Sequence, residues 1–364
     1  MEISAKIDGI KYEPKLCRKL NTYNYNQLGH ALSVDASFLL KIDENNKIAL
    51  SWWVSPKRTR SYPYARVYDT LNFQGKKVTI IPVFKDEGKD GDRDFLQWDT
   101  ISLMSLLGIY TIVAYYKYAE KSSRYANKIT NQQFDICYIK DQIKNLLSYQ
   151  SDALHWNICQ IEQVNKIAQF ALEYYKKISE NLKVEMHSES SAEQRIQELN
   201  KGIENFKNLS RSLAEQAQNR ELMTIQPKEN LSGNKATITI KNYLGGFYYF
   251  TCDEAIIEND TVYLIEGKHS QKKFPSGEDI KDGLVKMILF KNLKEVTING
   301  KLYKHKPVLK LTCNIENLES KLDLLKKLEE ETKTNCFKTI IIRKNKLICS
   351  FPGILNNPLS LIIL

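Results

Sequence analysis

Two apolar, strand-like segments meet at a two-residue turn, and this feature constrains the fold of the chain most. Residues 247–257 and 261–265 are rich in β-branched and aromatic side chains. Between them, Asn259-Asp260 tolerates the left-handed backbone conformations that tight hairpin turns require. A turn of two residues also fixes the register of the hairpin. In that register Asp253 falls directly opposite Glu266, and Lys268 projects from the same face.

Two carboxylates in this position need a cation between them. Side chains directly opposite each other have Cβ atoms about 5 Å apart, and like charges that close destabilise a sheet. Few oxygen ligands, with positions left open for water and phosphate, are typical of a Mg²⁺ site. A lysine alongside can orient or deprotonate a metal-activated water and stabilise charge on a reacting phosphate. The hairpin therefore predicts a magnesium site at Asp253 and Glu266, with Lys268 beside it.

The residues of this hairpin carry a family resemblance. Asp253, followed by Glu266-x-Lys268 at the end of an apolar strand, resembles the PD-(D/E)xK nuclease superfamily. The continuation EGKHSQKKFPSGEDIKDGLVKMILF is similar to a group of type II restriction endonucleases, and the strong likeness covers residues 250–292. Cys252 stands where the name of the superfamily has proline, a position that often varies.

The resemblance implies a fold, an activity and a set of site residues. The fold is a restriction-endonuclease-like α/β core. The activity is Mg²⁺-dependent hydrolysis of phosphodiesters in double-stranded DNA by a sequence-specific enzyme of a restriction-modification system, which leaves 5′-phosphate and 3′-hydroxyl ends. Asp253, Glu266 and Gly267 form the implied metal site, and Lys268 positions the attacking water. The implied catalytic residues are Asp253, Glu266 and Lys268. A homodimer would match the two-fold symmetry of a palindromic target.

The distribution of apolar residues along the chain predicts a mixed α/β protein with three regions. Residues 1–125 alternate strand-like runs with one apolar helix and form an α/β region that we expect to recognise DNA. Residues 126–220 carry apolar side chains at helical spacing and predict a helical region that flanks or interrupts the core. Residues 221–364 hold the nuclease core and further strands. The strands expected in the first region are 48–54, 65–71, 77–84 and 109–116, and its expected helix is 95–107. In the third region we expect a helix at 278–292.

Cationic side chains predict contacts to DNA. Residues 52–66 interleave aromatic and basic side chains in a loop, which suits phosphate contacts and arginine readout of guanine edges. A lysine pair follows the hairpin and is placed to touch phosphates. A formal net charge of +10 also favours a polyanionic partner. The expected DNA-binding residues are Lys57, Arg58, Arg60, Arg66, Lys272 and Lys273.

A second Glu-x-Lys sequence, Glu87-Gly-Lys89, is an alternative catalytic site, which would suit a repair or recombination nuclease. It ends another apolar strand, but Asp69 does not fall opposite Glu87 in a register that the turn allows. Pro82 within that strand indicates a sheet edge. Otherwise the acidic loop 86–94 is expected to help hold the metal or to shape the DNA cleft.

A further alternative is a DNA-binding or assembly protein without catalysis, in which the Glu266–Lys268 pair is incidental. Seven cysteines without a CxxC pair indicate a reduced protein, and the chain has no GxxxxGKS loop for ATP. The first residues lack a secretory signal, and the longest uncharged stretch, 101–116, is too short to cross a membrane. We therefore expect a cytoplasmic protein that uses neither ATP nor a membrane.

Overall fold

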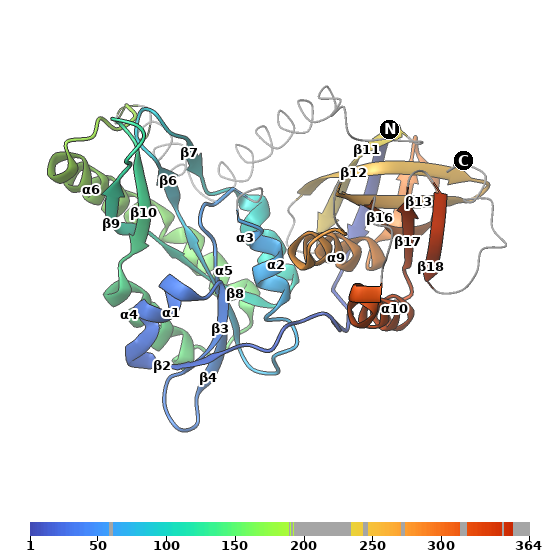
Figure 1. The fold of residues 1–364 in the computed structure, drawn as a ribbon, viewed down its shortest axis with the longest axis horizontal. Coiled ribbons are helices and arrows are strands. Elements are labelled where there is room, and N and C mark those ends of the chain that lie inside the picture. The colour runs from blue at the N-terminus through green and yellow to red at the C-terminus, as the bar shows by residue number, and fades with distance from the viewer. Residues whose placement is uncertain are drawn as a thin grey trace. The chain divides into compact units, whose positions relative to one another are not determined.

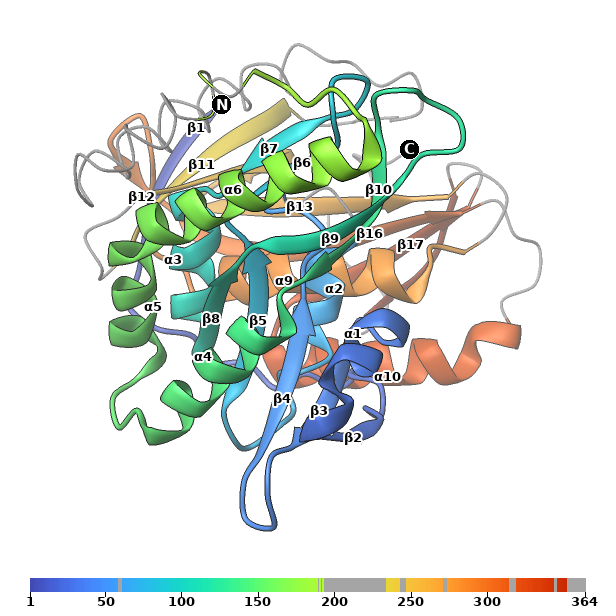
Figure 2. The ribbon, with the colours of Figure 1, turned by 90° about the vertical axis from the view of Figure 1, so that its left-hand side faces the viewer.

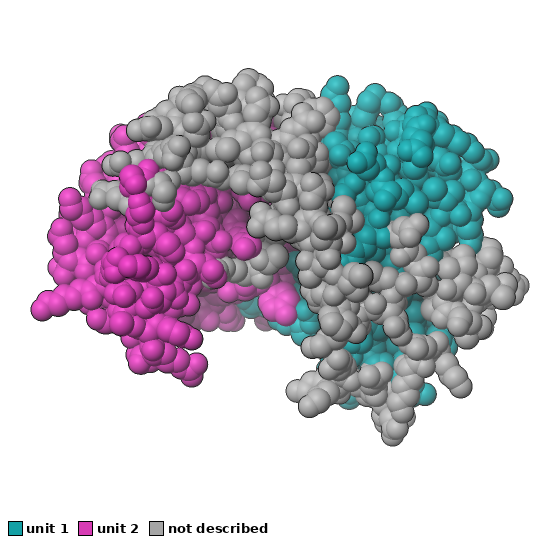
Figure 3. All heavy atoms as spheres, turned by 90° about the horizontal axis from the view of Figure 1, so that it is seen from above, with its two compact units in different colours: residues 1–18, 212–364 teal, residues 19–211 magenta. Residues whose placement is uncertain are grey.

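A computed structural model of the chain describes residues 1–57, 61–188, 190, 192, 234–242, 247–270, 274–313, 319–343 and 346–351. The chain forms two compact units (Figure 3): unit 1 comprises residues 1–18 and 212–364, and unit 2 comprises residues 19–211. Both units combine helices with sheets, so the mixed α/β class is confirmed. None of the described helices is long and apolar enough to span a bilayer.

The described strands of unit 1 belong to a single nine-stranded sheet, in the order β15-β14-β1-β11-β12-β13-β16-β17-β18. Among these strands, Figure 1 labels β11, β12, β13, β16, β17 and β18. Helix α9 packs on β13 and β16 and helix α10 on β17 and β18, and both lie on the same side of the sheet (Figure 2). The elements of unit 1 are β1 (Glu2–Ile7), β11 (Asn234–Asn242), β12 (Phe247–Glu258), β13 (Thr261–His269), α9 (Gly277–Lys291), β14 (Lys294–Ile298), β15 (Lys301–Leu302), β16 (Lys304–Cys313), the 3-10 helix η2 (Glu319–Lys321), α10 (Leu322–Asn335), β17 (Lys338–Arg343) and β18 (Lys346–Phe351).

The hairpin of β12 and β13 has the register expected from its turn. Glu258 pairs with Thr261, and the ladder continues to Glu254 opposite Ile265. Asn259 adopts a left-handed conformation with φ of 53°. A two-residue turn leaves no other pairing open, which is why the local sequence determined the register.

The first strand of the chain lies inside the sheet of unit 1. β1 pairs in parallel with β11 and antiparallel with β14, and its alternate residues Ile3, Ala5 and Ile7 are buried. Residues 1–18 therefore group with the C-terminal part of the chain, whereas residues 126–211 group with 19–125 in unit 2. The boundaries expected at 125 and 220 do not coincide with these units, because pairing across more than 200 residues leaves no local pattern in the sequence.

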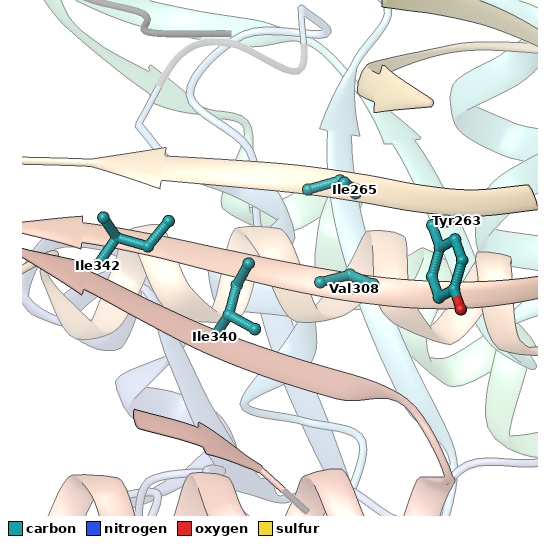
Figure 4. Packing of buried hydrophobic residues seen from close by; sticks show 5 residues of the cluster. All are labelled: Tyr263, Ile265, Val308, Ile340 and Ile342. Atoms are coloured by element: carbon teal, nitrogen blue, oxygen red, sulfur yellow. The ribbon is translucent and has the colours of Figure 1, made fainter. Parts of the chain in front are cut away.

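The face of the unit 1 sheet opposite α9 carries a compact apolar cluster (Figure 4). The parallel ladders β13–β16 and β16–β17 place its side chains next to one another. Such a cluster supplies burial of apolar area, the main favourable term in folding. Its members are Tyr263, Ile265, Val308, Ile340 and Ile342, with Ile256 packed against them.

Unit 2 is built on a five-stranded sheet, in the order β2-β3-β4-β5-β8, with two-stranded ribbons β6–β7 and β9–β10. Its elements are β2 (Thr22–Asn24), the 3-10 helix η1 (Tyr25–Gln27), α1 (Leu28–Val34), β3 (Ser37–Lys41), β4 (Lys47–Trp52), α2 (Pro63–Tyr68), β5 (Lys77–Pro82), β6 (Phe84–Asp86), β7 (Arg93–Phe95), α3 (Trp98–Leu106), β8 (Ile109–Ala114), β9 (Tyr116–Lys121), β10 (Ile129–Phe134), α4 (Ile136–Ser148), α5 (Ala153–Glu162) and α6 (Val164–Leu182).

Two sequence predictions in unit 2 are wrong. The strand expected at 65–71 is helix α2, whose first residue, Pro63, is a helix-start signal that the apolar pattern concealed. β5 is not an edge strand, because it lies between β4 and β8. Pro82 is tolerated there because it is the last residue of the strand. In the expected helical region, the described residues form β10 and then α4, α5 and α6.

Candidate active site at the end of the β12–β13 hairpin

Asp253 lies where β12 leaves β13. The ladder between the two strands ends at Glu254, one residue before the expected pair of Asp253 and Glu266. On the other side of β12, the pairing with β11 shifts register between Cys252 and Ala255, which marks a β-bulge. Beyond this point the N–H of Gly267 donates to Asp253 Oδ2 over 2.8 Å. The hairpin thus brings the Asp253 carboxylate to the Glu266-Gly-Lys268 segment through a side-chain bond and not through a backbone pair.

Glu266 is held by two ammonium groups. Its side chain is 2% exposed, Lys286 Nζ lies 2.7 Å from Oε2, and Lys268 Nζ lies 3.1 Å from Oε1. Burial acts to raise the pKa of Glu266, but the charges of Lys286 and Lys268 outweigh it and keep that pKa below its ordinary value. Glu266 is therefore an ionised carboxylate at neutral pH.

Lys268 bridges two acids. Besides Glu266, its ammonium contacts Asp282 Oδ2 at 2.7 Å. Burial acts to lower the pKa of Lys268, but the two carboxylates outweigh this effect and raise that pKa above its ordinary value. The ammonium stays protonated at neutral pH, so it cannot take a proton from water. Of the three roles expected for Lys268, the raised pKa argues against deprotonating a water, which leaves orienting a water and stabilising negative charge.

Asp253 differs from Glu266 in its charge balance. Within the described residues, no lysine, arginine or histidine forms an ion pair with Asp253 at hydrogen-bonding distance. Burial and the negative charge of Glu266 raise the pKa of Asp253 to about 7, and Lys286 offsets this only in part. A divalent cation between the two acids would oppose this shift, because a nearby positive charge favours the ionised form of Asp253.

The donor set fits a hard divalent cation. Asp253 and Glu266 supply carboxylate oxygens, the ligand type that Mg²⁺ prefers. The described residues contain no cluster of three or more His, Cys, Asp and Glu side chains suited to a metal. A cation here would be held by two carboxylates, which leaves coordination positions for water and substrate. Gly267, the third residue of the expected metal site, contributes its N–H to Asp253.

Helix α9 supplies two charged residues that the sequence interpretation missed. Asp282 and Lys286 are four residues apart, so they project from the same face of the helix and reach Lys268 and Glu266 on β13. Both lie within a segment that was interpreted only as an apolar packing face. The sequence did contain a signal for them: an acid and a lysine lie among the apolar residues of this helix, and charged side chains that become buried need partners from other elements.

Two local features place α9 against the sheet. Ser276 caps the helix start, where its Oγ accepts from the N–H of Asp279 over 3.1 Å, as the sequence predicts. Gly283 then allows close approach: a Cβ at this position would lie 2.8 Å from Leu309 Cδ1 and 3.2 Å from Lys268 Cε. The absence of a side chain at Gly283 therefore sets how near the helix comes to Lys268.

The second Glu-x-Lys sequence has a different arrangement. Glu87 is buried in unit 2 between Lys85 at 2.9 Å and Lys128 at 3.2 Å. Lys89 is exposed and pairs with Glu185 at 2.7 Å. Glu87 and Lys89 thus have separate ion-pair partners, and the grouping seen at Glu266 and Lys268 is not repeated.

The neighbouring acids of this second sequence have partners of their own. Asp69 ends helix α2. Asp86, at the start of the acidic loop 86–94, lies 2.7 Å from His187 Nδ1. Both acids belong to unit 2, whereas Asp253 and Glu266 belong to unit 1.

The expected DNA-binding residues are described only in part. Arg58, Arg60, Lys272 and Lys273 lie outside the described residues. Lys57 is exposed, 3.9 Å from Asp94.

Arg66 is bound within unit 2. Its guanidinium donates to Trp52 O over 2.9 Å and stacks on the Trp52 ring at 4.4 Å. Burial lowers the pKa of Arg66 to about 10. A DNA contact by Lys57 or Arg66 stays a prediction.

Comparison with known proteins supplies no relative for this chain. No protein-family model matches it, and neither the curated proteins nor the solved structures include a significant match. The functional assignment therefore depends on the geometry of the site.

Proposed function

We propose that the chain is a Mg²⁺-dependent, sequence-specific endonuclease of double-stranded DNA that belongs to a restriction system, with a PD-(D/E)xK core in unit 1. The observation that carries the proposal is the grouping of Asp253, Glu266 and Lys268 at one end of a hairpin. Glu266 is ionised, Lys268 is charged, and Asp253 is an acid without an ammonium partner among the described residues. Strongly perturbed titratable groups that share a position are candidates for catalysis.

The residues of the site divide the work of hydrolysis. Asp253 and Glu266 hold the cation, which when bound supplies an acidified water and neutralises charge on the phosphate. Lys286 keeps Glu266 ionised and fixes one of its oxygens. Lys268 keeps its proton and directs N–H groups toward the water or toward the charge that develops on the phosphate.

The proposal extends to the partner and the products. The net charge of +10 favours association with the DNA backbone. We infer cleavage to 5′-phosphate and 3′-hydroxyl ends without ATP, in the cytoplasm. A homodimer would read the two halves of a palindromic site.

One observation favours a second candidate, a DNA-binding or assembly protein without catalysis. Both oxygens of Glu266 already accept from ammonium groups, as in a buried ion-pair network that only fastens a helix to a sheet. Buried networks of this kind perturb pKa values without any catalytic role. The two candidates predict opposite results for cleavage.

A cleavage assay decides between them. The purified chain is incubated with plasmids of mixed sequence, with Mg²⁺ or with EDTA. We expect discrete fragments with Mg²⁺ alone, and a loss of at least about a hundredfold in Lys268→Ala and in Glu266→Ala. Lys89→Ala is the matched control, because it removes the lysine of the other Glu-x-Lys sequence, and it should cut as the wild type does.

Other outcomes of this assay would redirect the assignment. A wild type that does not cut, or Lys268→Ala and Glu266→Ala proteins that cut normally, would discard the site. Loss of cutting in Lys89→Ala and in Glu87→Ala alone would move the catalytic centre to unit 2. Circular dichroism of each variant shows whether lost cutting reflects lost folding.

A further inference from the structure

A chain of alternating charges connects α9 to the proposed active site. Asp282 Oδ2 lies 2.7 Å from Lys268 Nζ, which lies 3.1 Å from Glu266 Oε1. The other oxygen of Glu266, Oε2, lies 2.7 Å from Lys286 Nζ. Both ends of this chain are residues of α9, and both residues in its middle are on β13.

In this arrangement the Lys268 ammonium contacts Glu266 Oε1, and Glu266 would need a free oxygen to bind a metal ion. Lys286 also donates to the Thr251 carbonyl at 3.3 Å, so a second acceptor holds its ammonium in place beside Glu266 Oε2. Oε1 is then the oxygen that can change partner. A divalent cation on Oε1 would repel the ammonium that now lies 3.1 Å from that atom.

Asp282 offers Lys268 another position. Its contact with the ammonium is the shorter of the two, 2.7 Å against 3.1 Å. Side-chain exposure also rises along this series of charged residues, from 2% for Glu266 to 17% for Lys268 and 23% for Asp282. Movement of the ammonium toward Asp282 is therefore a movement outward, and it leaves no buried charge unpaired.

We propose that Asp282 is a positioning residue that holds the Lys268 ammonium when a divalent cation replaces it on Glu266. The inference rests on the proposed function and deepens it, because it assigns a role outside the Asp253, Glu266 and Lys268 set. Lys268 exchanges one carboxylate for another and stays beside the site, still charged. Asp282 acts through Lys268 and has no contact of its own with the reacting atoms.

Binding of Mn²⁺ without DNA tests this role independently of cleavage. Titration calorimetry on the full chain compares wild type, Asp282→Asn, Lys268→Met and the double variant. We expect Asp282→Asn to weaken Mn²⁺ binding about tenfold, because Lys268 then competes more strongly for Glu266 Oε1. Lys268→Met should bind at least as tightly as wild type. In the Lys268→Met background, Asp282→Asn should have little further effect.

Two further variants control for charge and for shape. Asp323 and Lys327 form the same four-residue spacing on α10, exposed and 3.3 Å apart, so Asp323→Asn should leave Mn²⁺ binding unchanged. Asp282→Glu keeps the charge and should bind within a few-fold of wild type.

The inference is overturned if Asp282→Asn binds Mn²⁺ as wild type does, or loses as much affinity in the Lys268→Met background as in wild type. It is also overturned if Asp282→Glu loses as much affinity as Asp282→Asn. A wild type that neither binds Mn²⁺ nor cuts DNA would overturn the proposed function, and the inference with it. A wild type that binds and cuts, with an unaffected Asp282→Asn, would overturn the inference alone.

Discussion

Two glutamates of unit 1 occupy opposite faces of one sheet and offer a direct comparison. Glu254 and Glu266 are each 2% exposed. Glu254 pairs with Ile265 across the hairpin, so its side chain points away from the face that carries Glu266. Glu254 contacts Lys310 at 2.6 Å, just as Glu266 contacts lysines on its own face.

The two faces differ in what surrounds the ion pair. The Glu254–Lys310 pair lies on the same face as the apolar cluster of Tyr263 and Ile265. On the face of Glu266 lie a second acid with a raised pKa, Asp253, and a third, Asp282, which shares Lys268. A buried Glu–Lys pair therefore does not mark a catalytic centre. A neighbouring acid that has no lysine partner at hydrogen-bonding distance and a raised pKa, as Asp253 has among the described residues, is the stronger sign of a functional site.

The largest expected effect concerns the lysines of the two faces. Lys310→Met removes the ammonium that lies 2.6 Å from the buried Glu254, and breaking a buried ion pair costs about 3–5 kcal/mol of the free energy of unfolding. Lys286→Met should cost less, because Lys268 still contacts Glu266. Urea unfolding of the full chain measures both, with the exposed Lys327→Met as the control near zero. Equal losses in Lys310→Met and Lys286→Met would mean that the second lysine gives Glu266 no support.

The pH dependence of stability distinguishes Asp253 from Glu266, whose pKa is lowered. In the folded protein the pKa of Asp253 is about 7, against an ordinary 3.8, so the folded state holds this proton more tightly than the unfolded state. This contribution to stability is fully present below pH 4, falls as the pH rises through 7, and is then lost. The total is up to about 4 kcal/mol, because one pKa unit corresponds to about 1.4 kcal/mol.

The variant Asp253→Asn isolates this effect. It keeps an acceptor for the Gly267 N–H but carries no charge, so it should be more stable than wild type at pH 8 and nearly equal at pH 4. Urea unfolding in EDTA at pH 4, 6 and 8 measures the difference. A constant difference across these pH values would show that Asp253 titrates in its ordinary range.

The smallest expected effect concerns two glycines of α9. Gly283→Ala places a Cβ 2.8 Å from Leu309 Cδ1 and 3.2 Å from Lys268 Cε, and we expect a loss of about 1–2 kcal/mol together with reduced cleavage. Gly277 on the same helix has no neighbour within 4 Å of its Cβ position, so Gly277→Ala should be close to neutral. Thermal unfolding and cleavage of both variants provide the comparison. If Gly283→Ala changed neither stability nor cleavage, α9 could move away from the sheet without cost, and Gly283 would not set the position of Lys268.

The sequence predicted local features of unit 1 better than distant ones. The turn at Asn259 fixed the hairpin register, and Ser276 marked the start of α9, because each depends on residues a few positions apart. The bulge at Asp253 was missed, because it arises from pairing with β11. Asp282 and Lys286 were visible as a spacing, but their partners are on another element, which only the packing of α9 brings near.

The position of β1 has a consequence for how the protein is made. This strand is translated before unit 2, yet its neighbours β11 and β14 begin only at Asn234 and Lys294. Residues 19–211 of unit 2 are translated between β1 and both of these neighbours, so unit 2 can begin to fold while β1 still lacks its partners. The hairpin that carries Asp253 and Glu266 is also translated after unit 2, so the sheet around these two acids is completed only when β11 to β18 have all been made.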